Sequence, residues 1–202
     1  MQLYVVGEVV GLTGITAPAA HCKWWVVAAK PWQHVSGDDK GASQCDTPAE
    51  GEHMFVFQHP IDVCYEMGAE TLDNTAMPRI EVEVRWRDEY GRSDLGGYAV
   101  VHVPATPGTH ELSVRVWRPR GSMGDRFAAF FIGGYPSLRD PTMRYGFAED
   151  GDEDHGTRLT RSAGGQRMST APFGELHLRL HVCQKSGTSG TTDLNAAAVD
   201  ED

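Results

Sequence analysis

Hydrophobic and polar residues alternate with a period of two at the start of the stretch from Pro78 to His110. Such alternation places one set of side chains on each face of a half-buried β-strand. The stretch therefore predicts a strand with one face toward a core and one solvated outer face that bears ion pairs rather than an acid/base couple. The apolar set is Ile80, Val82, Val84 and Trp86, and the charged set is Glu81, Glu83, Arg85 and Arg87.

Two further β-rich runs follow this strand. A loop that contains Tyr90 and closes at Gly96-Gly97 leads into a run from Tyr98 to Val103. Pro104 ends that run, because proline has no N–H to continue a ladder. After a Pro-Gly turn the alternation resumes over residues 112–117. These consecutive strands with short joins predict an antiparallel arrangement.

The remaining strand candidates lie on both sides of this region. The clearest is the run from Leu176 to Val182, in which apolar residues alternate with His177, Arg179 and His181. Near the N-terminus, Gly7 interrupts the run from Leu3 to Val10 and predicts a bulge or a close backbone approach. Residues 37–52 lack a hydrophobic period and are expected to form a long loop. The other strand candidates are residues 22–28, 32–36, 54–57 and 61–65.

One short helix is predicted after residue 121. Ser122 suits the N-cap position and Gly133-Gly134 would end the helix. Phe127, Phe130 and Phe131 are spaced i, i+3 and i+4, so they share one face. Such a face either closes one end of a sandwich core or forms an exposed docking face, and the sequence does not separate the two. About eight strands with one short helix predict an all-β antiparallel sandwich.

The net charge of −10 is concentrated in two segments. Five carboxylates lie within residues 149–154, and the segment after Cys183 carries four carboxylates and one lysine. The rest of the chain is nearly balanced, so nucleic acid is not an expected partner, because binding to phosphates needs clustered Lys and Arg. We expect one domain over residues 1–183, with a mobile acidic insertion around residues 148–170. Residues 184–202 are expected to be a disordered tail.

The cysteines and the apolar segments favour a cytosolic chain. The four cysteines form no C-x-x-C pair and no regular framework, so reduced thiols are the simplest interpretation. The N-terminal segment lacks the basic region of a signal peptide. The longest uncharged, mostly apolar stretch, Phe127 to Leu138, falls short of the roughly 20 residues that a membrane-spanning helix needs.

No phosphate-binding loop, nucleophile elbow or dinucleotide-binding pattern occurs in the sequence. His177 and His181 share one face of a strand, but four residues of strand separate them by about 13 Å, too far to share a metal. We expect these histidines to be solvated partners of nearby acids. The sequence therefore predicts no catalytic residue, no cofactor and no metal site.

Seven short motifs, in order along the chain, resemble the B9 domain family. The resemblance extends over about residues 1–182 and implies a C2-like β-sandwich. The motifs are C-K-W at residues 22–24, D-T-P at 46–48, H-P-I-D at 59–62, D-x-x-G-R at 88–92, G-Y-A-V-V-H-V-P at 97–104, P-G-T-H at 107–110 and W-R-P-x-G-S at 117–122.

The same resemblance implies a non-enzymatic role. It implies that the chain acts with the two other B9-domain paralogues and further members of the tectonic-like (Meckel syndrome) complex. The implied location is cytoplasmic and cytoskeletal, at the cilium basal body and transition zone. There the complex supports cilium assembly and the barrier to entry of membrane proteins.

The C2 comparison raises the question of a calcium site. Calcium-binding C2 domains present D-x-D-x5-D in one loop, because a hard cation needs several carboxylate oxygens. Asp88 and Asp94 stand at the last two of these positions, but Trp86 stands at the first. The second contributing loop, residues 11–20, contains no acid. We expect no calcium site.

Two functions remain open at this point. The first is an interaction module that binds other B9 domains through sandwich surfaces or sheet edges. Its candidate contact residues are Phe127, Phe130, Phe131 and Tyr135. The alternative is a calcium-independent peripheral membrane module that binds phosphoinositides. Its candidate lipid contacts are Arg85, Arg87, Arg115 and Arg118.

Overall fold

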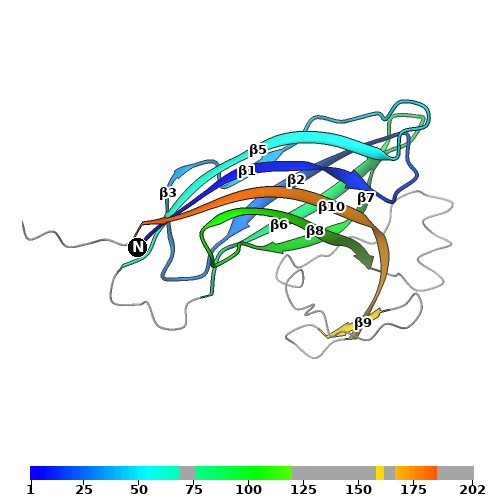
Figure 1. Ribbon diagram of the computed structural model, residues 1–202. Coiled ribbons are helices and arrows are strands. Elements are labelled where there is room, and N and C mark those ends of the chain that lie inside the picture. Colours follow the sequence, from blue (N-terminus) through cyan, green and yellow to red (C-terminus); the bar gives the residue numbers. More distant parts are fainter. Residues whose placement is uncertain (69–75, 120–157, 162–166, 186–202) are drawn as a thin grey trace, which may run out of the picture.

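The computed structural model describes residues 1–68, 76–119, 158–161 and 167–185, with side chains for residues 1–68, 76–119 and 170–185. Within these ranges the chain forms ten β-strands and no helix (Figure 1). The strands are β1 (Gln2–Thr13), β2 (Ala19–Val27), β3 (Gln33–Gly37), β4 (Lys40–Ala42), β5 (Met54–Glu66), β6 (Arg79–Arg87), β7 (Ser93–His102), β8 (Gly108–Pro119), β9 (Arg158–Arg161) and β10 (Arg167–Lys185).

The strands follow one antiparallel hydrogen-bonded path in the order β3-β5-β1-β10-β8-β7-β6-β2-β4. Between β8 and β7 the path is joined by a single residue pair, Tyr98 and Trp117. At this join the path divides into a five-strand half (β3, β5, β1, β10 and β8) and a four-strand half (β7, β6, β2 and β4). Side chains from both halves form one hydrophobic core. The predicted all-β antiparallel sandwich is therefore confirmed.

The core follows the alternation that the sequence shows. On β10, the inward residues Leu176, Leu178, Leu180 and Val182 are each at most 2% exposed. Inward residues of β1 and β5 lie beside them, and the four-strand half contributes Trp24, which is 2% exposed, and Ile80, which is fully buried. These side chains close the space between the halves, because interiors pack to nearly crystalline density.

Gly7 lies at a close approach of two central strands. β1 pairs with β10 so that Gly7 faces Leu180. A Cβ atom at Gly7 would collide with the carbonyl oxygen of Arg179 and lie 2.9 Å from the Cα atom of Leu180. The prediction of a close backbone approach at Gly7 is confirmed, and the register shift of β1 lies farther along, between Val9 and Gly11.

Two predicted boundaries differ from the structure. The expected loop at residues 37–52 contains the short strand β4, whose three residues pair with β2 from Lys23 to Trp25. The two strands expected around His59-Pro60 are one strand, β5, in which Gln58 takes a positive φ of 43°. Pro60 is tolerated inside this strand, where it lies opposite Glu8.

Several predicted features lie wholly or partly outside the residues that the structure describes. The helix expected from Ser122 lies outside the described residues, as does the tail from residue 186 onward. Most of the expected acidic insertion lies outside them too. Within its expected bounds, β9 pairs with the first residues of β10, where β10 extends past the sandwich (Figure 1).

A segment that carries the D-T-P motif closes the sandwich on the side away from the β7–β8 join. Along β2, the Ser43 N–H donates to the Cys22 carbonyl at 2.9 Å, and the Cys22 N–H donates to Ser43 Oγ at 3.0 Å. Ala20 and Asp46 exchange two backbone hydrogen bonds of 2.9 and 2.8 Å. The segment that leads into the D-T-P motif therefore runs along the part of β2 that contains the start of the C-K-W motif.

The same segment also occupies the edge of β5. The Val56 N–H donates to Asp46 Oδ2 at 2.7 Å, and the Gln44 side-chain amide donates to the Phe57 carbonyl. Side chains thus satisfy backbone groups that an incoming strand would need. Strand addition, one of the predicted modes of partner binding, is disfavoured at this edge.

The charged face predicted for β6 is only partly solvated. Glu83 pairs with Arg85 at 2.9 Å, as the interpretation of ion pairs requires. Glu81, however, is 1% exposed, accepts a hydrogen bond from Trp25 Nε1 at 2.9 Å and pairs with Arg79 at 3.1 Å. The prediction that Glu81 lies on a solvated face is wrong, because tertiary packing covers a face whose sequence looks exposed.

Candidate functional site

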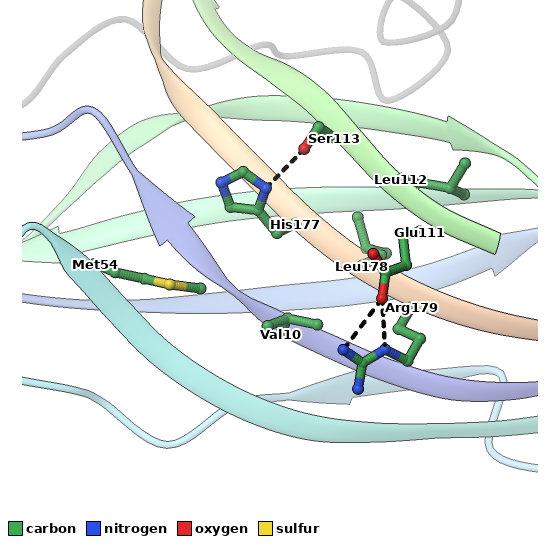
Figure 2. A pocket seen from close by; sticks show the side chains of 8 residues that line it. All are labelled: Val10, Met54, Glu111, Leu112, Ser113, His177, Leu178 and Arg179. Atoms are coloured by element: carbon green, nitrogen blue, oxygen red, sulfur yellow. Dashed lines mark hydrogen bonds and ion pairs between the residues drawn. The ribbon is translucent and has the colours of Figure 1, made fainter.

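The outer face of the five-strand half carries rows of polar side chains centred on β10. In the first row, His177 lies between two hydroxyl groups from neighbouring strands. Thr13 Oγ1 is 2.9 Å from its Nε2 atom. On the other side, Ser113 Oγ is 2.7 Å from its Nδ1 atom (Figure 2). Both ring nitrogens of His177 are therefore engaged.

The next rows continue along β10. Arg179 reaches Glu8 on β1 at 3.2 Å and Glu111 on β8 at 3.3 Å. Farther along, Thr109 Oγ1 lies 2.8 Å from Nδ1 of His181. The expectation that acids would be the partners of the histidines is wrong: within the described residues the hydroxyls contact the histidines and the acids contact Arg179.

A groove of about 320 Å³ opens beside these rows (Figure 2). Its apolar lining comes from four strands, and its polar lining comes from the first two rows. The apolar residues are Val10, Met54, Leu112 and Leu178, and the polar ones are Glu111, Ser113, His177 and Arg179. A concave, mostly apolar surface with a few fixed polar groups is the usual form of a binding site.

The contact between Ser113 and His177 resembles a nucleophile–base pair, but its chemistry differs. A catalytic dyad needs a free imidazole nitrogen for the serine proton and a third group that orients the ring. Here the second nitrogen faces the Thr13 hydroxyl rather than a carboxylate. The arrangement fixes the orientation of the imidazole between two hydroxyls, without the carboxylate that completes a Ser-His-Asp triad.

Exposed apolar side chains accompany the groove. Tyr4 and Val6 lie on the outer face of β1, at 38% and 46% exposed, and Val56 on β5 is 40% exposed. The sequence interpretation missed them, because the run from Leu3 to Val6 is apolar throughout. The signal was present, however, because a strand whose successive residues are all apolar carries hydrophobic side chains on both of its faces.

The structure separates the four arginines that were predicted to contact lipid. Arg85 and Arg87 lie on the outer face of β6, because Val84, which alternates with them, is fully buried in the core. Arg115 and Arg118 lie on opposite faces of β8, since they are three residues apart on a strand. Arg118 stacks on Phe173 at 5.3 Å from the ring centroid. The predicted set is therefore not one contact surface.

A different group of cations surrounds Arg85 and Arg87. In the pairing of β2 with β6, His21 lies opposite Arg85, and Lys23 lies on the same outer face. Burial, and then the charges of Arg85, Arg87 and Lys23, lower the pKa of His21 below its ordinary value, while Glu83 acts in the opposite direction. We call His21, Lys23, Arg85 and Arg87 the basic cluster.

The predicted aromatic contact patch cannot be placed. Phe127, Phe130, Phe131 and Tyr135 lie outside the described residues, so their role stays a prediction.

The loop compared with calcium-binding C2 domains is organised around an internal ion pair. Asp88 accepts hydrogen bonds from Arg92 Nε at 2.6 Å and from the backbone N–H groups of Arg92 and Tyr90 at 2.8 and 2.9 Å. Burial acts to raise the pKa of Asp88, but the hydrogen bonds and charge of Arg92 outweigh it and lower the pKa. The side chain of Asp88 is therefore engaged within its own loop, and Asp94 Oδ1 accepts the Leu95 N–H at 2.8 Å.

Two further properties follow from the described part of the chain. Within it, no group of three His, Cys, Asp or Glu side chains is close enough to hold a metal ion. No helix in these ranges has the length and apolar character needed to cross a bilayer.

Known proteins resemble this chain over nearly its whole length. The B9-C2 family, described as "Ciliary basal body-associated, B9 protein", matches residues 3–183. B9 domain-containing protein 2 of Bos taurus is 34% identical over 181 residues, which are 90% of this chain and 92% of the relative. The protein of the same name from Danio rerio is 36% identical over 148 residues, covering 73% and 82% of the two chains.

A paralogous protein and a solved structure match more weakly. B9 domain-containing protein 1 of Xenopus laevis is 28% identical over 125 residues, or 61% of each chain. A solved C2 domain of plant Extended Synaptotagmin 1 covers 91% of this chain and 96% of its own length, at 9% identity and a TM-score of 0.40. The predicted resemblance to B9 domains is confirmed by the family match and the close relatives, and the chain belongs to the B9-C2 family of ciliary basal body-associated proteins.

Proposed function

We propose that this chain is a non-enzymatic interaction component of the tectonic-like (Meckel syndrome) complex at the ciliary transition zone. In this role it assembles with the two other B9-domain paralogues and contributes to cilium assembly and to the barrier for membrane proteins. The match of residues 3–183 to a family associated with the ciliary basal body carries the proposal. The similarity to B9 domain-containing protein 1 supports it, because that protein is a paralogue of the kind the proposal requires.

The geometry of the outer sheet face agrees with a binding role. The imidazole of His177 is oriented by hydroxyls on two strands, which suits a fixed contact surface better than a reacting group. Exposed apolar side chains beside fixed polar ones are typical of protein interfaces.

Co-purification tests the proposal. The full chain carrying an affinity tag is expressed together with its two B9 paralogues, and a purified stoichiometric complex is the expected result. Recovery of the folded chain without either paralogue would contradict it. In ciliated cells, loss of the chain should remove the paralogues from the transition zone while their total amounts persist.

A second candidate function is calcium-independent binding to anionic lipid through the basic cluster. The observation that favours it is the position of Lys23, Arg85 and Arg87 on one outer face of β2 and β6, because an anion held there would relieve the repulsion among these cations. Flotation with phosphoinositide vesicles in the presence of a calcium chelator tests this function. Arg87→Glu should abolish flotation, and the matched change Arg115→Glu, at an exposed site on the other half, should leave it intact. Equal flotation of both variants would exclude the basic cluster as the lipid site.

A further inference from the structure

Exposed apolar side chains gather on the outer face of the five-strand half. Five large hydrophobic side chains are exposed within the described residues, and four of them belong to β1, β3 and β5. Tyr4 and Val6 point outward from β1, and Val10 and Met54 continue the apolar surface into the groove. We call these four side chains the apolar strip. Exposed apolar side chains on one sheet face indicate a contact surface, and on this face Glu8 lies between Val6 and Val10 along β1.

The polar groups beside the apolar strip are already fixed. His177 is held by Thr13 and Ser113, and Arg179 is held between Glu8 and Glu111. Figure 2 shows the contacts with Ser113 and Glu111. Side chains that are ordered before binding lose less conformational entropy on association. The face is therefore pre-organised for a rigid partner, and the groove gives it a concave region that a projecting side chain can fill.

Charge identifies the chemistry of the partner. Arg179 is shared by two carboxylates, and the outward residues Asp62 and Glu66 of β5 add two more beside the apolar strip. Asp62 lies directly opposite Val6 in the pairing of β1 with β5. An excess of carboxylates repels anionic lipid and attracts cations. The complement of this face is an apolar surface with a basic rim.

The same fold can present such a basic surface. On the opposite half of this chain, the basic cluster lies on the outer face of β2 and β6. A neighbouring B9 domain that exposes a comparable basic face would meet the carboxylates of the five-strand half. Contacts between unlike faces build a chain of domains rather than a closed symmetric dimer.

We infer that the outer face of the five-strand half is the docking surface for a paralogous B9 domain, with the apolar strip and the neighbouring carboxylates as its contacts. This inference rests on the proposed function, because it names the surface through which the paralogue binds. Tyr4 and Val6 anchor the contact, and Glu111, whose side chain is 77% exposed, steers the basic rim of the partner.

The test uses purified full-length chain and purified B9 domain-containing protein 1 from the same organism, with affinity measured by isothermal titration calorimetry. Val6→Lys places a cation at the centre of the face, where Asp62 stabilises it within the monomer. This variant and Tyr4→Ser should each weaken binding at least about tenfold. Tyr90→Ser is the matched control, because Tyr90 is 83% exposed in the loop that follows β6. Its affinity should stay within about twofold of wild type.

Circular dichroism and thermal unfolding establish that each variant is folded. If the wild-type proteins bind and both Val6→Lys and Tyr4→Ser bind equally well, the inferred docking surface is wrong. The proposed assembly with paralogues would still hold in that case. Absence of binding between the two wild-type proteins would contradict the proposed function, and the docking surface with it. A membrane contact is the alternative outcome. If the wild-type chain floats with anionic vesicles and Tyr4→Ser abolishes this flotation, the face binds lipid and the inference is wrong.

Discussion

The replacement Gly7→Ala tests whether β1 and β10 are packed as closely as the structure shows. A methyl group at this position would collide with the carbonyl oxygen of Arg179 and lie 2.9 Å from the Cα atom of Leu180. Both atoms belong to the backbone, so no side-chain rotation relieves the contact. The two central strands would have to move apart and weaken the ladder between them.

The expected loss of stability follows from these contacts. Overpacking a tight site costs about 1–3 kcal/mol, and each weakened ladder hydrogen bond adds about 0.5–1.5 kcal/mol. We expect Gly7→Ala to lower the free energy of unfolding by about 2–4 kcal/mol. For a chain of this size each kcal/mol lowers Tm by about 2–4 °C. Calorimetry and urea unfolding measure both quantities.

Gly68→Ala provides the matched control. A Cβ atom there has nothing within 4 Å, so the change should alter stability by less than about 0.5 kcal/mol. Unfolding of Gly7→Ala within 0.5 kcal/mol of wild type would refute the close approach of β1 and β10.

Four further predictions concern the core, a buried thiol and the basic cluster. Leu180→Ala, at a fully buried site, should cost about 2–5 kcal/mol in urea unfolding, and a cost below about 1 kcal/mol would contradict its place in the core. Burial raises the pKa of the Cys22 thiol to about 11. Iodoacetamide at pH 8 should therefore label the exposed Cys45 and leave Cys22 unlabelled until the chain unfolds. Mass spectrometry of the labelled chain measures both sites. Burial and nearby cations lower the pKa of His21, so folding favours its neutral form. As the pH drops below the ordinary pKa of 6.5, the unfolded chain takes up the proton first, and the free energy of unfolding should therefore fall. Arg85→Met should raise the pKa of His21 in an NMR titration, and an unchanged pKa would argue against a contribution from that charge.

The strands of the core were predictable from local alternation. The residues of β10 and the apolar set of β6 show a period of two, and their inward members are buried as expected, except that Trp86 is half-buried. The opposite faces of Arg115 and Arg118 follow from the same rule, because their spacing is odd, so this signal was present in the sequence. β4 was missed, because three residues without a hydrophobic pattern owe their structure to pairing with β2.

The candidate site depends on strand order, which local sequence does not reveal. His177 is 64 residues from Ser113 and 164 from Thr13, and β8, β10 and β1 become neighbours only in the folded sheet. The burial of Glu81 likewise depends on tertiary packing, because its sequence neighbours are those of a solvated strand face. Residue type and spacing therefore predicted the sandwich, but not which polar groups meet on its surface.

The account of this chain as an interaction module of B9 proteins is tested most directly by size-exclusion chromatography with light scattering. The full 22.1 kDa chain is mixed with its two purified paralogues at concentrations well above 1 μM. We predict that all three proteins elute together at a mass equal to their sum. Elution of each protein at its own mass, with every component folded, would contradict the proposed assembly.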